Sequence, residues 1–153
     1  GIPPDDERLR DAFDLAKKVG MKYQIKEIDL GENYHPNTVK IVANTNDDTI
    51  TVVGSSVGGG NIIIEEIDGL QAGFNGDKPT VISLHEDRMG MLAKITEIIT
   101  KHRLNIESMR LSRDAKKKLA LCYIEVNKII DDSVLLDLSV IPGMKKVRVL
   151  NVW

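Results

Sequence analysis

The feature that most constrains the fold is a regular alternation of short apolar segments between Pro79 and Leu150. Segments with the period of a strand and segments with the period of a helix follow one another along this stretch. The predicted strands are residues 80–85, 105–111, 119–126 and 145–152, and the predicted helices are residues 90–102 and 131–138. Two βαβ units in tandem predict a ferredoxin-like βαββαβ sandwich, in which both helices cover one face of a four-stranded antiparallel sheet.

The loop between the first of these strands and the first helix reads HEDRMG (residues 85–90). A helix that begins here presents unpaired backbone N–H groups and the positive end of its dipole. The imidazole of His85 and the carboxylate of Asp87 lie close to that helix start in the sequence, and Gly90 opens the helix. A ligand with both a carboxylate and an ammonium group finds a partner for each end, so the loop is a candidate site for an amino acid.

Composition excludes several classes of function. Of the 153 residues, 42% are hydrophobic and 29% are charged, as in a soluble globular protein. A formal net charge of −2 and an aromatic content of 4% argue against nucleic acids and membrane surfaces as partners. The single cysteine, Cys122, excludes an internal disulfide and an iron–sulfur cluster held by this chain alone. No apolar run reaches the ~18 residues of a membrane helix and no signal peptide is visible, so we expect a cytoplasmic protein.

The first half of the chain predicts a smaller α+β module. Residues 5–19 predict a helix, with Asp5 or Asp6 as the N-cap and Gly20 after the last turn. Strands are predicted at residues 21–30, 38–43, 49–57 and 61–67, and the second and third of these form a hairpin around a polar turn. The glycine-rich residues 73–78 mark the best domain boundary. So few elements in ~70 residues indicate a partial βα module with an antiparallel sheet, and the start at Gly1 without a methionine suggests a longer polypeptide.

A glycine run in this module has a functional and a structural interpretation. Successive amides after a pair of serines can form a nest that binds a phosphate or a carboxylate. The same glycines can instead supply the positive φ angles of a tight turn or bulge. Both interpretations stay open for this second, anion-binding candidate, which consists of Ser56, Gly58, Gly59 and Gly60.

Other notable residues are expected to be structural. We favour a role for His35 in capping a strand through Asn37 over a contact with another part of the protein. Cys122 lies in an apolar strand and is expected to be a small buried hydrophobe rather than a nucleophile. Lysines 116–118 are expected to form a solvated turn. No spacing of histidines and cysteines supports a metal site, and no acid–base or nucleophile pair supports catalysis in this chain.

The second half of the chain resembles an ACT domain, the regulatory module that binds small amino acids in enzymes of amino-acid metabolism. The resemblance rests on the loop HEDRMG (residues 85–90), on LNI (104–106) and on IPGMKKVRVL (141–150). It implies that an effector lies between the first loop and the first helix, at an interface where two ACT domains pair. By position it assigns His85, Asp87 and Gly90 as loop contacts and Asn105 as the contact from the paired domain.

The first half narrows the resemblance. HPNTVKI (residues 35–41) and GSSVGGGNIIIEEIDG (54–69) resemble the regulatory β part of the iron–sulfur-dependent L-serine dehydratases. The resemblance implies that residues 1–75 are the C-terminal part of an allosteric substrate-binding domain and that residues 76–153 are the ACT domain. The serine- and histidine-rich segment expected near the start of the β part is absent, as are the cysteines of the catalytic part.

This resemblance implies a regulatory segment of the lyase that converts L-serine to pyruvate and ammonia. Its partners would be L-serine or a related small amino acid, a catalytic α part that holds a [4Fe-4S] cluster, and a second copy of the chain in a homodimer. The segment itself would hold no cofactor. One alternative is the serine-sensing regulatory tail of a D-3-phosphoglycerate dehydrogenase, because the resemblance implies that a related module occurs in some of these enzymes. Another is a free-standing amino-acid-binding module.

Overall fold

The computed structural model describes residues 2–3 and 5–152 of the chain. The chain divides into two compact units, the first within residues 1–33 and the second formed by residues 34–152. Gly1 lies outside the described residues. Within the described ranges, no helix combines the length and the apolar character needed to cross a membrane.

The first unit contains one short helical segment. It consists of a 3₁₀-helix, η1 (Glu7–Asp11), and an α-helix, α1 (Ala12–Lys18). Asp6 caps η1 through its carboxylate, and the hydrogen bonds that this carboxylate accepts from the Arg8 side chain lower the pKa of Asp6 to about 2. Gly20, at φ +74°, follows α1, and the N–H of Met21 donates to the carbonyl of Ala16 in a Schellman motif. The predicted helix and its two terminal signals are therefore confirmed.

The strand predicted at residues 21–30 is wrong. These residues belong to no helix or strand, and Tyr23, Ile25 and Ile28 are exposed. Their alternation marks a segment with one apolar side, but a strand is stable only when a neighbouring strand accepts and donates its backbone hydrogen bonds. Local alternation carries no information about whether such a neighbour is present.

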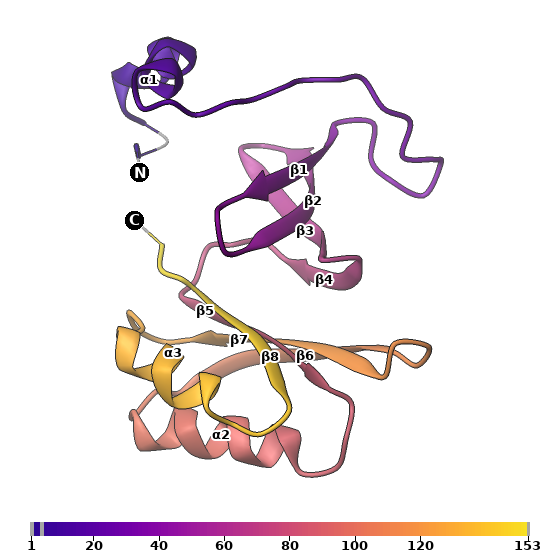
Figure 1. The fold of residues 1–153 in the computed structure, drawn as a ribbon, viewed down its shortest axis with the longest axis vertical. Helices are drawn as coiled ribbons and strands as arrows, with labels where there is room; N and C mark the ends of the chain where they lie inside the picture. The colour runs from indigo at the N-terminus through magenta and orange to yellow at the C-terminus, as the bar shows by residue number, and fades with distance from the viewer. Residues whose placement is uncertain (1, 4, 153) are drawn as a thin grey trace. The chain divides into compact units, whose positions relative to one another are not determined.

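The second unit begins with a four-stranded antiparallel meander in the order β1-β2-β3-β4 (Figure 1). Its strands are β1 (Thr38–Asn44), β2 (Thr49–Gly58), β3 (Asn61–Ile67) and β4 (Leu70–Phe74). The predicted hairpin of β1 and β2 and the predicted strand β3 are confirmed. Strand β4 was not predicted, because five residues that include Gly73 and precede a polar stretch are typical of a loop. Leu70, Ala72 and Phe74 are all buried, so tertiary packing defines this strand.

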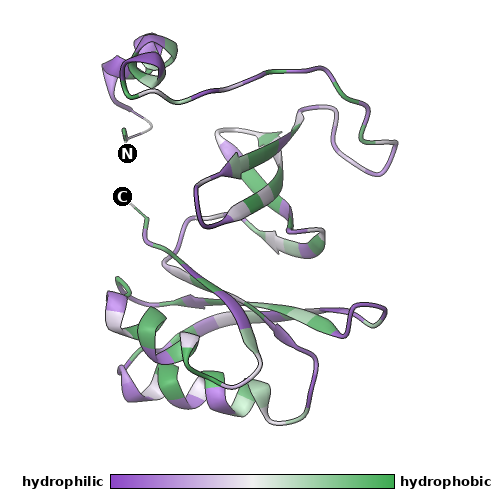
Figure 2. Cartoon of the chain, viewed as in Figure 1, coloured by the Kyte–Doolittle hydropathy of each residue, from purple (hydrophilic) through white to green (hydrophobic). Residues whose placement is uncertain are grey.

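The remaining elements form a ferredoxin-like domain, as predicted. They are β5 (Thr80–Glu86), α2 (Met91–Lys101), β6 (Ile106–Asp114), β7 (Leu119–Val126), α3 (Asp132–Ser139) and β8 (Met144–Leu150). The strand order is β6-β7-β5-β8 with antiparallel neighbours, and α2 and α3 lie on the same face of the sheet (Figure 1). Each helix has a hydrophobic and a hydrophilic side (Figure 2), which is the pattern of a helix that buries one face.

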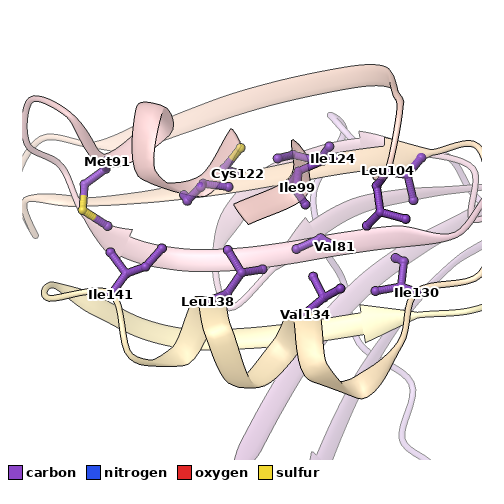
Figure 3. Close-up of a cluster of buried hydrophobic side chains, with 12 residues drawn as sticks. Val81, Met91, Ile99, Leu104, Cys122, Ile124, Ile130, Val134, Leu138 and Ile141 are labelled. Carbon is purple, nitrogen blue, oxygen red and sulfur yellow. The ribbon is translucent and has the colours of Figure 1, made fainter. Parts of the chain in front are cut away.

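The core of this domain lies between the sheet and the two helices (Figure 3). It contains Val81, Met91, Ile95, Ile99, Leu104, Cys122, Ile124, Val126, Ile130, Val134, Leu138 and Ile141. Full burial of each large aliphatic side chain stabilises the fold by about 1.5–3 kcal/mol. Cys122 is fully buried here, as predicted, and burial raises the pKa of its thiol to about 12.

The opposite face of the β5–β8 sheet packs against the meander. The shared core consists of Ile67, Leu70, Ala72, Phe74, Ile82, Leu121 and Tyr123. The hydroxyl of Tyr123 donates to the carbonyl of Gly73 at 3.1 Å. Arg148 on β8 contacts Asp48 at 2.8 Å and Asp68 at 3.2 Å, so ion pairs flank the apolar contact.

Candidate effector-binding site

The predicted site is the connection from β5 to α2. Strand β5 ends at Glu86 and α2 begins at Met91, with Gly90 as the N-cap residue at φ +83°. A positive φ costs little only for glycine, so Gly90 fixes the direction in which the helix starts. No side chain caps α2, and the N–H groups of its first turn have no acceptor within the helix. These amides and the positive end of the helix dipole are available to an anion.

His85, predicted as the first residue of the loop, is instead the last but one residue of β5, and it is 2% exposed. Its Nδ1 is 2.8 Å from the carbonyl oxygen of Glu86. Because a carbonyl oxygen can only accept, Nδ1 carries the proton, and Nε2 of the neutral ring is then an acceptor. Nε2 is buried and has no hydrogen-bond partner among the described residues. An unpaired buried acceptor of this kind costs about 1–3 kcal/mol, so the site contains a polar atom that the protein alone does not satisfy.

Asp87 connects the loop to the hairpin between β6 and β7. Its backbone N–H donates to the carbonyl of Lys118 at 3.0 Å, and its Oδ1 is 3.2 Å from Nε of Arg113. The sequence identified Asp87, but it gave no sign of this pairing, because Arg113 lies 26 positions away. Only the register of the sheet brings the two side chains together. The second carboxylate oxygen of Asp87 makes no ion pair within the described ranges.

The other wall of the loop is formed by the start of β8. The N–H of Glu86 donates to the carbonyl of Gly143, and Arg88 donates to the carbonyl of Pro142. Lys145 contacts Glu86 at 2.8 Å, and this hydrogen bond is the main reason that the pKa of Glu86 is lowered. The loop is therefore fixed on both sides by backbone and ionic contacts. These contacts with residues 142–145 were not predicted as part of the site.

Asn105 is exposed and lies immediately before β6. Its N–H donates to Oδ1 of Asn127 at 3.1 Å. Ile106 pairs with one end of β7, whereas Glu86 pairs with the other end. Seven residues of strand separate these ends by about 23 Å, so one chain does not bring Asn105 to its own His85. The contact of Asn105 with a second copy of the loop stays a prediction.

The glycine run lies at the hairpin between β2 and β3. Gly58, Gly59 and Gly60 have φ values of +93°, +63° and +81°. Gly59 and Gly60 form the two-residue turn, across which Gly58 pairs with Asn61, and such a turn requires positive φ at both central residues. The structure thus gives the glycines a role in the turn, and an anion bound by Ser56 and these amides stays a prediction.

Two smaller predictions have clear outcomes. The N–H of Asn37 donates to Nδ1 of His35 at 3.1 Å, so the capping role of His35 is confirmed. Lysines 116–118 are exposed, as predicted for a solvated turn. Among the residues that the structure describes, no three histidine, cysteine, aspartate or glutamate side chains gather in a way that would hold a metal ion.

Comparison with known proteins agrees with the fold and with the predicted family. Residues 80–143 match the family described as "ACT domain", and we conclude that they form an ACT domain. The chain is 34% identical to the "L-serine dehydratase, beta chain" of Peptoniphilus asaccharolyticus, over 87% of this chain and 60% of that protein. It is 32% identical to the "Probable L-serine dehydratase, beta chain" of Bacillus subtilis (strain 168), over 93% of this chain and 64% of that protein.

The chain thus spans about 60% of the length of these curated relatives. A more distant relative is a "D-3-phosphoglycerate dehydrogenase" of Methanocaldococcus jannaschii, which is 24% identical over 83% of this chain and 24% of that protein. The predicted resemblance to the regulatory β part of L-serine dehydratases is confirmed by the first two matches together with the ACT domain.

Proposed function

We propose that this chain, which contains an ACT domain and is related to the beta chains of L-serine dehydratase, is the regulatory segment of an L-serine dehydratase and binds L-serine beside α2. The enzyme would convert L-serine to pyruvate and ammonia in a catalytic α part. The observation that carries the proposal is the buried Nε2 of His85, which lacks a hydrogen-bond partner among the described residues and lies near the end of β5, just before the loop that opens the uncapped helix α2.

L-serine has a group for each feature of the loop. The free N–H groups at the start of α2 would bind the carboxylate of the amino acid. The carboxylate oxygen of Asp87 that Arg113 leaves free would accept from the ammonium group. The hydroxyl of serine would donate to Nε2 of His85, which removes the cost of the unpaired acceptor. This last contact distinguishes serine from alanine, which has no hydroxyl.

Completion of the pocket requires a second copy of the chain. Asn105 lies at the far end of its own sheet from Gly90, so its side-chain amide would reach the ammonium group only from a paired ACT domain. Edge strands β6 and β8 leave backbone groups open for such pairing. We therefore propose a homodimer in which each serine is held between two chains and shifts the equilibrium between two states of the enzyme.

The family resemblance also implies a [4Fe-4S] cluster, and the residues of this chain do not fit one. Such a cluster is held by about four cysteine thiolates, whereas this chain has one cysteine. That cysteine, Cys122, is buried in the core and burial raises the pKa of its thiol. We therefore assign the cluster to the α part and no catalytic step to this chain.

Titration calorimetry with L-serine tests the proposal. We expect saturable binding to the unmodified protein, and at least about tenfold weaker binding of L-alanine, because one hydrogen bond to a buried group is lost. His85→Ala and Asn105→Ala should each abolish measurable binding, whereas Asn46→Ala, which removes an amide from the exposed turn between β1 and β2, should have no effect. Unchanged serine binding in both site variants would rule out the pocket.

A regulatory tail of a D-3-phosphoglycerate dehydrogenase is the second candidate, because such an enzyme is also a relative of this chain. In that enzyme serine would inhibit as a product of the pathway. The residues encoded before Gly1 distinguish the two candidates. A glycine-rich dinucleotide fingerprint there would indicate the dehydrogenase, and a set of cysteines in the same or a partner chain would indicate the dehydratase.

A further inference from the structure

A polar cleft lies within residues 34–152, and one of its lining residues, Arg113, pairs with Asp87 of the connection between β5 and α2. It has a volume of about 590 Å³. One side is formed by residues 69–71 at the β3–β4 turn of the meander, and the other by residues 110–116 at the end of β6. The cleft is therefore built by two sheets that the shared apolar core already holds together.

Arg110 extends from β6 into this cleft. It pairs with Tyr123 in the sheet, and its guanidinium group lies directly over Gly73 of β4. A Cβ atom at position 73 would be only 2.5 Å from Nη1 of Arg110. Gly73 also has φ +96°, which a residue with a side chain rarely adopts. The positive φ of Gly73 and its lack of a Cβ atom therefore both leave room for the guanidinium group of Arg110.

The cleft has an excess of positive charge although the whole chain carries −2. Within the described residues, neither Arg110 nor Lys116 has a carboxylate within 4.0 Å. Asp114 is the acidic residue of the lining, and it is already engaged. Its carboxylate accepts from the N–H groups of Lys116 and Lys117 and pairs with Nζ of Lys117 at 3.4 Å. These contacts lower the pKa of Asp114, so it stays ionised and bound within its own turn.

Hydrogen-bond donors complement the two cations. The hydroxyl of Ser112 lines the cleft and makes no hydrogen bond within the described part of the chain. Gln71, an exposed residue of β4, lines the opposite side. A planar guanidinium group binds carboxylate and phosphate oxygens through two parallel hydrogen bonds, and an ammonium group with a hydroxyl completes a set of donors for a small anion.

We propose that this cleft is a binding site for a small oxyanion, a phosphate or a short carboxylate, held by Arg110 and Ser112, which lie two residues apart on one face of β6, while Lys116 adds positive charge at the end of the cleft. The bound anion lies between the meander and the ACT sheet, because residues of both line the cleft. Arg113, next to Ser112, contacts Asp87 in the connection from β5 to α2. The anion therefore binds to the same β6–β7 hairpin that supports this connection. The site does not depend on the proposed binding of serine.

NMR titration of the protein with inorganic phosphate, and separately with pyruvate, tests this site and distinguishes the two sources of the anion. We expect saturable shifts of the backbone amides of Gln71 and Ser112 with at least one of them, weakened by added salt. Arg110→Gln should weaken binding at least about tenfold, and Gly73→Ala should weaken it by displacing the guanidinium group. Lys128→Gln removes an exposed lysine elsewhere in the domain and serves as the matched control, with unchanged affinity.

Saturation by neither anion, or equal affinity in the unmodified protein and Arg110→Gln, would overturn the proposal. The backbone spectrum of each variant reports folding, and Arg110→Gln changes an exposed side chain, so loss of the fold does not obscure the result. L-serine titrated into the same samples separates the two sites. Serine binding that survives in Arg110→Gln, while phosphate or pyruvate binding is lost, supports the cleft as an independent site.

Discussion

Replacement of His85 by leucine tests whether this buried histidine beside the connection from β5 to α2 serves ligand binding rather than the stability of the fold. A buried polar residue that serves only the fold has all its polar atoms paired, so its loss is costly. His85 has one paired nitrogen and one unpaired buried nitrogen. We therefore expect that His85→Leu removes ligand binding while the free energy of unfolding changes little.

The expected magnitude follows from three contributions. Loss of the hydrogen bond from Nδ1 to the carbonyl of Glu86 costs about 1 kcal/mol. Removal of the unpaired Nε2 from the interior stabilises by about 1–3 kcal/mol. Leucine and histidine are similar in size, so the packing cost stays below about 1.5 kcal/mol. The sum lies between a loss of about 1.5 kcal/mol and a gain of about 2 kcal/mol.

Urea unfolding of the unmodified protein, His85→Leu and His85→Ala measures this balance. His85→Ala also leaves a cavity, which typically costs about 2–5 kcal/mol for a large buried side chain. Ser83→Ala is a useful control, since it removes a buried hydroxyl that donates to the carbonyl of Cys122, and it should cost about 1 kcal/mol. A loss of more than about 3 kcal/mol in His85→Leu would refute the reasoning, because it would mean that Nε2 is satisfied in the folded protein.

Three further outcomes are expected. The hydrogen bond from Lys146 holds the pKa of Asp48 below its ordinary value of 3.8, so its stabilising effect is complete well above pH 3.8 and is lost as pH falls through the lower folded pKa. Urea unfolding of Asp48→Asn should therefore differ from the unmodified protein at pH 6 and converge with it in acid. Asp47→Asn removes an exposed carboxylate of the same turn that makes no ion pair among the described residues, and it is the control with an unchanged unfolding free energy at pH 6. Cys122 should resist a thiol reagent at pH 8 until the protein is unfolded, and rapid labelling of the native protein would contradict its burial. Gly90→Ala should destabilise the fold by about 1–2 kcal/mol through strain at positive φ alone, since nothing lies within 4 Å of the added Cβ, and an unchanged unfolding free energy would argue against the left-handed N-cap.

The local pattern of the sequence predicted the helices and strands of the ferredoxin-like domain almost completely. Helices that bury one face and strands between polar turns have distinct periods, and both periods are visible within a few residues. The same holds for the helix end at Gly20 and for the hairpin of β1 and β2, because caps and turns depend on the chemistry of neighbouring residues. The candidate loop at residues 85–90 was identifiable for the same reason.

The tertiary structure decided what depends on partners distant in the chain. It removed the strand at residues 21–30, which has no neighbour, and it defined β4 by burying Leu70, Ala72 and Phe74. It paired Asp87 with Arg113 and placed Arg110 over Gly73 through the register of β6. It also left Nε2 of His85 without a partner. Hydrogen-bond partners and ion pairs between sheets are set by register and packing, and these are properties of the folded chain that no short stretch of sequence contains.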